Sequence, residues 1–192
     1  MLELPAKDFI EALRFALSCA GKNDVRYYIN GVAFDLLGQT LTLAGTDGHR
    51  GAYVEFRCRP LPADGVWIVQ RADVELLLKV QKPDSGTVCL EFGSEGIQVG
   101  PVLLRHIDGK FPDWRRVLKP HNGPEPTEVV GLNSKYIAEA GKACARLSNS
   151  KYHGTRLELR GPNNAVFFLP GISAADFPEL TKAAIIVMPM RL

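Results

Sequence analysis

The chain has 192 residues, of which 46% are hydrophobic and 23% are charged, and its formal net charge is +2. This length holds one or two compact domains, and the small charge excludes a polycation that binds nucleic acid through its total charge. The cysteines Cys19, Cys58, Cys89 and Cys144 form no Cys-x-x-Cys pair, which argues against zinc and disulfide frameworks and favours reduced thiols. No long apolar run opens the chain, so we expect a cytoplasmic protein.

The first predicted unit is a short strand, an amphipathic helix and three further strands. Apolar residues recur at steps of three and four from Phe9 to Ala20, which is the period of a helix with one buried face. Alternating segments follow at residues 32–37, 40–44 and 52–56, and glycine-containing turn signals separate them.

The same order recurs twice more. The second unit is predicted as a strand at 66–69, a helix that stops at Pro83, and strands at 87–92, 97–99 and 102–106. In the third, Val129 and Val130 are predicted as a strand before a helix that reaches Leu147, and the later strands are placed at 155–159, 165–169 and 183–188. Three β-α-β-β-β repeats indicate an α+β fold, and the breaker-rich segment 119–126 is the predicted linker between the first two units and the third.

The polar face of each predicted helix carries three basic residues and one acidic residue. The sets are Lys7, Arg14 and Lys22 with Glu11; Arg71, Lys79 and Lys82 with Glu75; and Lys135, Lys142 and Arg146 with Glu139. One such stripe is usually an ordinary solvated face. Three equivalent stripes predict a common basic surface suited to salt-sensitive contact with a phosphate backbone and to little base readout.

An acid, a histidine and an arginine lie close together at Asp47, His49 and Arg50. These residue types are compatible with a catalytic site, a metal site or one lip of a binding groove. No nucleophile elbow, phosphate loop or metal-ligand spacing accompanies them, so we interpret Asp47-Gly48 as a tight turn and expect neither enzyme activity, metal nor cofactor.

Five segments in order resemble one family, the bacterial DNA polymerase III β subunit or sliding clamp. They are "DVRYYINGVAFD" (24–35), "TDGHR" (46–50), "DGKFPDWRRVL" (108–118), "LSNSKYHGTRL" (147–157) and "VMPMRL" (187–192). The resemblance implies a DNA-clamp fold in which residues 1–118 correspond to the family's middle domain. Residues 127–192 then correspond to half of the third domain with the family's C-terminal tail, and the first domain and the rest of the third have no counterpart.

The resemblance also implies a processivity factor that tethers replication proteins to DNA through a peptide-binding pocket. Carried over by position, the pocket residues are Ile29, Thr46, Gly48, His49, Arg50, Pro112, Arg116, Val117, Tyr152, Val187, Met188, Pro189, Met190, Arg191 and Leu192. Tyr27 and Tyr28 resemble clamp residues that contact DNA, and they join the basic residues of the three stripes as the expected DNA-binding set. Gly51 stands where the family usually has leucine, so one apolar wall of the pocket is expected to be missing.

The partners implied by the resemblance are duplex DNA bound without sequence specificity, a DNA polymerase, other clamp-binding peptides and a clamp loader. The alternative function is a non-encircling peptide-binding module that competes for or recruits clamp clients. Because three half-units leave one unpaired, we expect two chains to join their odd halves in a homodimer. Closure of two dimers into a tetrameric ring is a further hypothesis.

Overall fold

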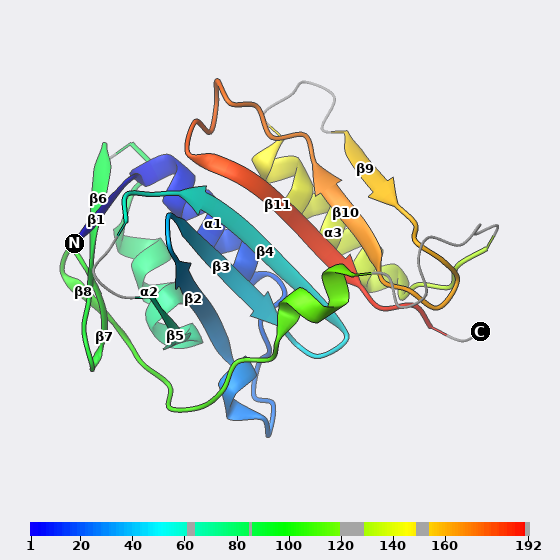
Figure 1. Cartoon of the computed structure of the whole chain (residues 1–192), viewed down its shortest axis with the longest axis horizontal. Helices are drawn as coiled ribbons and strands as arrows, with labels where there is room; N and C mark the ends of the chain where they lie inside the picture. The colour runs from blue at the N-terminus through cyan, green and yellow to red at the C-terminus, as the bar shows by residue number, and fades with distance from the viewer. Residues whose placement is uncertain (61–63, 85, 120–128, 149–153, 191–192) are drawn as a thin grey trace.

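The computed structural model of the chain describes residues 1–60, 64–84, 86–119, 129–148 and 154–190. These residues form a seven-stranded and a four-stranded antiparallel sheet, and the three α-helices lie on one side of the larger sheet (Figure 1). No helix in the described ranges is long and apolar enough to span a membrane.

The first two units exchange their leading strands. The first unit contains β1 (Leu2–Pro5), α1 (Ala6–Leu17), β2 (Gly31–Leu37), β3 (Thr40–Thr46) and β4 (Arg50–Arg57). The second contains β5 (Gly65–Gln70), α2 (Arg71–Val80), β6 (Thr87–Phe92), β7 (Gly96–Val99) and β8 (Val102–Arg105). Strand β1 pairs with β6 of the second unit, and β5 pairs with β2 of the first, so neither unit completes its sheet alone.

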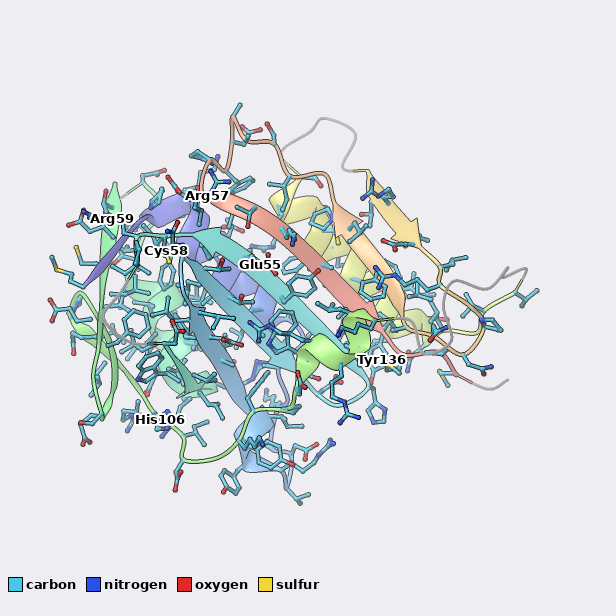
Figure 2. All side chains as sticks on the ribbon, viewed as in Figure 1. Glu55, Arg57, Cys58, Arg59, His106 and Tyr136 are labelled. Atoms are coloured by element: carbon cyan, nitrogen blue, oxygen red, sulfur yellow. The ribbon has the colours of Figure 1, made fainter. Side chains whose placement is uncertain are left out.

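The third unit extends the sheet of the first. It contains α3 (Ser134–Leu147), β9 (Thr155–Glu158), β10 (Val166–Pro170) and β11 (Leu180–Val187). Strand β11 pairs antiparallel with β4, which gives the strand order β5-β2-β3-β4-β11-β10-β9. On this seam the Lys182 ammonium lies 3.5 Å from the carboxylate of Glu55, which is labelled in Figure 2.

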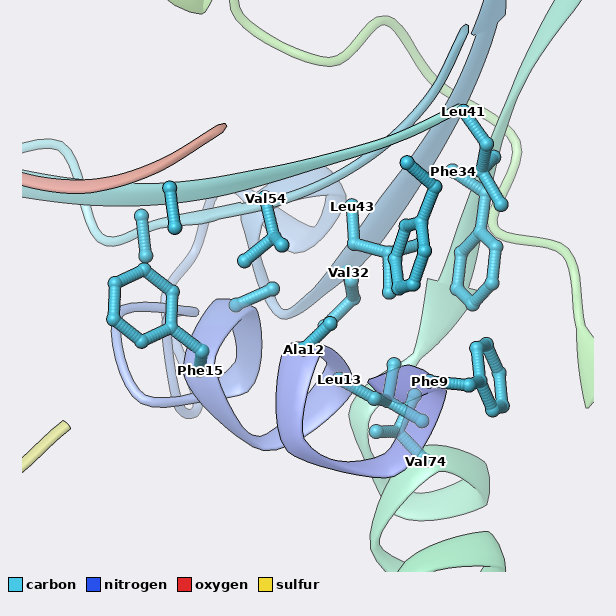
Figure 3. Close-up of a cluster of buried hydrophobic side chains, with 14 of the residues drawn as sticks. Phe9, Ala12, Leu13, Phe15, Val32, Phe34, Leu41, Leu43, Val54 and Val74 are labelled. Atoms are coloured by element: carbon cyan, nitrogen blue, oxygen red, sulfur yellow. The ribbon is translucent and has the colours of Figure 1, made fainter. Parts of the chain in front are cut away.

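The main core lies between the helices and the sheets. Phe9 and Leu13 of α1 are fully buried against Val32 and Phe34 of β2, and the Phe9 and Phe34 rings are 6.3 Å apart (Figure 3). Burying one such side chain stabilises the fold by about 1.5–3 kcal/mol. This apolar stripe therefore explains why residues 6–17 form a helix against the sheet.

The opposite, outer face of the large sheet is covered by residues 106–118. Phe111 packs against Ala33, Ala44 and Ile68, and this segment ends in a short 3₁₀ helix, η2 (Trp114–Leu118). A second 3₁₀ helix, η1 (Tyr27–Ile29), precedes β2. The large sheet is thus covered by helices on one face and by this segment on the other.

Most elements agree with the predicted ones within two residues. Helices α1 and α2 end at Leu17 and Val80, so Lys22 and Lys82 of the predicted basic faces lie beyond the ends of their helices.

Two strand predictions also differ from the structure. The last strand begins at Leu180 instead of residue 183, because its pairing with β4 extends past a register irregularity to Phe56. Val129 and Val130 are not in a strand, since no neighbouring strand pairs with them in the described part of the chain. Most of the predicted linker, residues 120–126, lies outside the described ranges.

Candidate functional site

The large sheet has an apolar groove on its outer face, over the seam between β4 and β11. The groove has a volume of about 250 Å³. It is lined by Arg26, Tyr28, Ile29, Gly45, Thr46, Gly48, Arg50, Gly51, Ala52, Tyr53, Pro112, Asp113, Trp114, Val117, Ile186 and Met188. Four segments distant in sequence therefore meet in one hollow.

Aromatic and apolar side chains form one wall of this groove. The rings of Tyr53 and Trp114 stack with their centroids 4.9 Å apart. Val117 and Met188 are 38% and 39% exposed, so apolar surface is available to a visitor. Methionine adapts its shape to different apolar partners, and a stacked aromatic pair offers a rigid contact surface. The chemistry suits the apolar side chains of an extended peptide.

Gly51 lies in the groove and leaves space there. A Cβ atom at this position would lie 3.5 Å from the Gly45 oxygen and 3.8 Å from the Thr46 side chain, which are ordinary contacts. The backbone therefore does not require glycine at this position, and its absent side chain widens the groove.

The turn between β3 and β4 holds the Asp47 carboxylate in a structural role. Its Oδ1 atom accepts hydrogen bonds from the backbone N–H groups of His49 (2.9 Å) and Arg50 (3.0 Å). Gly48 has φ +90°, a conformation that glycine adopts without steric cost. These contacts support the interpretation of Asp47-Gly48 as a tight turn.

Arg50 connects this turn to the third unit. Its guanidinium pairs with Asp47 at 3.0 Å and with Glu139 of α3, and it lies 4.5 Å from the ring centroid of Tyr136, which is labelled in Figure 2. Only 11% of the Arg50 side chain is exposed. Its charge is therefore compensated within the protein, although the side chain borders the groove.

The structure brings only part of the predicted peptide-binding set together. The groove is lined by Ile29, Thr46, Gly48, Arg50, Pro112, Val117 and Met188 of that set. His49 lines a separate basic cleft on the helix side of the sheet, and Val187 is fully buried in the main core. Outside the groove lining are Arg116, Pro189 and Met190, and outside the described ranges are Tyr152, Arg191 and Leu192.

The helix side of the molecule has a wide basic cleft between α1 and α3, bordered by the start of α2. Its volume is about 880 Å³. The charged lining comprises the cations Arg14, Lys22, Arg50, Arg71, Lys135, Lys142 and Arg146 and the anions Asp24, Asp47, Glu75 and Glu139. Cations outnumber anions here by seven to four, so the cleft is positive although the chain is almost neutral.

Six residues of the predicted DNA-binding set line this cleft: Arg14, Lys22, Arg71, Lys135, Lys142 and Arg146. Lys7, Lys79 and Lys82 are exposed but outside its lining, Tyr27 borders a smaller hollow, and Tyr28 lines the groove. Several cleft cations have acidic partners. Glu11 pairs with Arg14 and lies 3.8 Å from Arg146, and Glu75 lies 3.6 Å from Arg71. These pairs reduce the charge available to a ligand.

Sequence reasoning missed several groove residues. Arg26, Tyr53, Asp113, Trp114 and Ile186 line the groove but were absent from the predicted set. The alternation of β4 offered one signal, because Tyr53 must face away from the side on which Ala52 and Val54 are buried. For the other four residues, no local pattern indicated that their segments meet.

No group of three histidine, cysteine, aspartate or glutamate side chains within the described ranges is arranged to hold a metal ion. The Asp47 and Arg50 side chains already have the partners described above. The cluster in the turn is accordingly accounted for by hydrogen bonds and ion pairs of the fold.

Comparison with known proteins gives consistent matches. A family model described as "DNA polymerase III beta subunit, central domain" matches residues 3–113. The beta sliding clamp of Proteus mirabilis is 33% identical over 158 residues, with 80% of this chain and 41% of the relative covered. That of Escherichia coli K12 is 34% identical over 156 residues, with 79% and 40% covered. The chain thus spans about two fifths of the length of these curated relatives.

Solved structures share the fold. The DNA polymerase III subunit beta from Pseudomonas aeruginosa has a TM-score of 0.70 at 23% identity, covering 99% of this chain and 65% of that one. The subunit from Thermotoga maritima has a TM-score of 0.69 at 14% identity, with the same coverage. A further Pseudomonas aeruginosa clamp, with a TM-score of 0.67 at 23% identity and with 99% and 65% covered, was solved bound to griselimycin.

Proposed function

The chain belongs to the DNA polymerase III β subunit, or sliding clamp, family, and on that premise we propose that it tethers replication proteins to DNA as a clamp-like processivity factor. Sliding clamps are non-enzymatic, so Asp47 and His49 have no catalytic role in this proposal. The observation that carries it is the presence of two different surfaces on opposite faces of one sheet, an apolar groove and a basic cleft.

The groove is the proposed site for short peptides of a polymerase or another replication protein. Its stacked Tyr53 and Trp114 rings and the exposed Met188 offer apolar contacts to alternate side chains of an extended segment. Asp113, which is exposed in the groove lining, can pair with peptide charges or backbone groups, whereas the Arg26 guanidinium is already paired with Asp24 at 2.8 Å. A griselimycin-bound relative supports the choice of that compound as a probe.

The cleft is the proposed site for duplex DNA. Lysine and arginine side chains from α1, the start of α2 and α3 border it, and flexible cations of this kind contact phosphates without reading bases. Such binding weakens with salt because counterions are released from the DNA. Sequence specificity is not expected.

One observation favours the alternative of a peptide-binding module that does not encircle DNA. Several cleft cations are already paired with Glu11, Glu75 or Glu139, whereas the groove keeps exposed apolar surface. A module of this kind would retain the groove chemistry and bind DNA weakly or not at all.

The groove is tested with Trp114 as a reporter. A Trp67→Phe background leaves Trp114 as the only tryptophan, and griselimycin binding should change its fluorescence. Met188→Asp should abolish the change, because it places a charge in the apolar wall. The matched control, Leu103→Asp on the smaller sheet, replaces another partly exposed apolar side chain and should leave binding intact. Absence of binding to the parent protein contradicts the groove proposal.

The cleft is tested by retention on primed closed-circular and linear DNA. A tethering clamp stays longer on the circular form, since it can slide off a linear end. Lys142→Glu and Arg146→Glu should each lower the slope of log affinity against log salt by about 1, whereas Lys182→Glu, on the β4–β11 seam and outside the cleft lining, should not. Griselimycin binding without retention on either DNA form would support the alternative and contradict a DNA-tethering role.

A further inference from the structure

The seven-stranded sheet is almost symmetric about its β4–β11 seam. On one side of the seam the order is β4, β3, β2, and on the other it is β11, β10, β9. The edge of β2 that faces away from β3 pairs with β5, the leading strand of the second unit. The matching position beside β9 has no strand in the described part of the chain. One sheet position is therefore vacant.

The segment before α3 has the features of a leading strand. The N-cap residues of α1, α2 and α3 are Pro5, Gln70 and Asn133. Counted back from these caps, Val130 and Leu132 occupy the positions of Leu2 and Leu4 in β1 and of Trp67 and Val69 in β5. Val130 and Leu132 also pack against the main core. The residue pattern of the two paired strands is thus present a third time.

A shared hydrogen bond supports this equivalence. The carbonyl two residues before the cap of α2, that of Ile68, accepts from Ile107 N at 2.7 Å, just after β8. The carbonyl two residues before the cap of α3, that of Gly131, accepts from Met190 N at 2.8 Å, just after β11. One edge of residues 129–132 is therefore hydrogen-bonded in the same way as the corresponding edge of β5. The opposite edge of residues 129–132, which in β5 pairs with β2, has no strand beside it in the described ranges.

Apolar side chains are exposed where this partner would lie. Ile137 is 43% exposed, whereas Phe9 and Val74, at the same distance from their own caps, are fully buried (Figure 3). Leu157 pairs with Phe168 and so shares its core-facing side, yet it is 55% exposed. The third unit therefore presents an apolar face beside its open edge, which soluble proteins usually cover.

We propose that this face is covered by a second copy of the same chain, with residues 129–132 of each copy adding as a strand to β9 of the other. The first two units of the chain supply the template, since β1 and β5 are exchanged in this way. A reciprocal exchange has twofold symmetry, so the same surface serves both partners and the contact closes as a dimer. This assembly is independent of the groove and of the cleft.

The template also fixes the register. Trp67 lies opposite Phe34, and Val69 lies opposite Val32. Strand β2 starts at Gly31, and β9 directly follows Gly154, so Leu157 takes the position of Phe34 and Thr155 that of Val32. The exchange accordingly places Val130 of one copy opposite Leu157 of the other.

The register is tested by disulfide trapping in a Cys89→Ser background, which removes the exposed native thiol. Cβ atoms of opposite residues in antiparallel strands are about 4.5–5.5 Å apart, close enough for a disulfide after small adjustment. Val130→Cys and Leu157→Cys chains should cross-link when they are mixed and oxidised. Neither variant should cross-link with itself, because the twofold axis separates identical positions. Absence of the mixed cross-link, or equal cross-linking of each variant alone, overturns the proposed register.

The dimer itself is tested by light scattering of the whole chain at micromolar concentration. The expected mass is twice the 21.1 kDa of one chain. Leu157→Asp should return the mass to that of one chain. The control Leu103→Asp changes an apolar residue on β8, an edge strand of the smaller sheet, and should leave the dimer intact. A monomeric parent protein, or a dimer dissociated by Leu103→Asp and not by Leu157→Asp, overturns the proposal. A folded Leu157→Asp monomer, checked by circular dichroism, separates lost assembly from lost folding.

Discussion

The Arg50 side chain lies between the two proposed binding surfaces of the large sheet. Arg50 borders both the groove and the cleft, and its guanidinium is held by Asp47, Glu139 and the ring of Tyr136. Two of these partners lie on α3. The residue therefore connects the turn of the first unit to the helix of the third, and its structural role is separable from any contact with a ligand.

Replacing Arg50 should destabilise the fold. Arg50→Ala leaves the Asp47 and Glu139 carboxylates without their shared cation, and we expect a loss of about 1–3 kcal/mol in the free energy of unfolding. Lys135→Ala removes a cation that is 74% exposed and 4.0 Å from Glu139, so its effect should stay within about 0.5 kcal/mol. Urea denaturation followed by circular dichroism measures both. Equal effects of the two variants would contradict a structural role for Arg50.

The Asp73–Arg105 pair should contribute to the acid sensitivity of the fold. Hydrogen bonds donated by Arg105 hold the pKa of Asp73 below its ordinary value, and burial opposes this effect only in part. Because the folded pKa is the lower one, the contribution is present above the unfolded pKa of about 4 and is lost as pH falls through the folded value.

Asp73→Asn should therefore lower the free energy of unfolding at neutral pH by about 1–3 kcal/mol. The difference from the parent protein should shrink as the pH falls below about 4. Urea denaturation across this pH range measures the difference. The exposed Asp84→Asn serves as the control. A difference that grows towards acid pH would refute the assignment.

The four thiols should differ in reactivity. Burial raises the pKa of Cys19 and of Cys144 to about 12, so almost no thiolate forms there at neutral pH. Cys89 is exposed on β6. A thiol-specific reagent should modify Cys89 first, and Cys19 and Cys144 only after unfolding. The fast phase should disappear in Cys89→Ser; rapid modification of Cys144 in the folded protein would contradict the burial described here.

Equivalent positions of the helices α1 and α3 should contribute unequally to the free energy of unfolding. Phe9→Ala removes a fully buried ring and should cost about 3–5 kcal/mol. Ile137→Ala, at the same distance from its helix cap, removes a side chain that is 43% exposed in one chain and should cost less than half as much. Denaturant unfolding at low protein concentration, where the proposed dimer would dissociate, compares the two. Equal losses would show that α3 is packed as α1 is.

Helices and strands could be predicted from the sequence because local patterns encode them. The alternation of Val32, Phe34 and Leu36 and the helical spacing after Phe9 gave elements close to those observed. The failure at Val129 and Val130 has a physical reason. Their pattern is that of a strand, but a strand also needs a neighbour for its hydrogen bonds, and none is present in the described part of the chain.

For the molecule as a whole, sequence patterns left the assembly of the units open. The basic stripes predicted a common positive surface, and six of their residues do border one cleft. The pairing of β4 with β11 is a contact between segments more than 100 residues apart, which no local pattern encodes. The groove depends on that seam, so Tyr53, Trp114 and Ile186 could not be brought together from sequence alone.

The division into two domains at residues 119–126 stays a prediction. The third unit follows this segment in the chain, yet its β11 continues the sheet of the first unit. Residues 119–126 therefore separate the units along the sequence, but the hydrogen-bonded sheet continues from the first unit into the third. The seam, rather than the linker, determines how the groove and the cleft are placed.

The central claim is that DNA and peptide ligands use opposite faces of one sheet. Lysine acetylation footprinting with primed duplex DNA tests it most directly, because lysines lie on both faces. DNA should protect Lys22, Lys135 and Lys142 of the cleft and leave Lys182 on the seam of the sheet reactive, and griselimycin should not reverse this pattern. Protection of Lys182, or loss of the cleft protection when griselimycin is added, would contradict the two-face account.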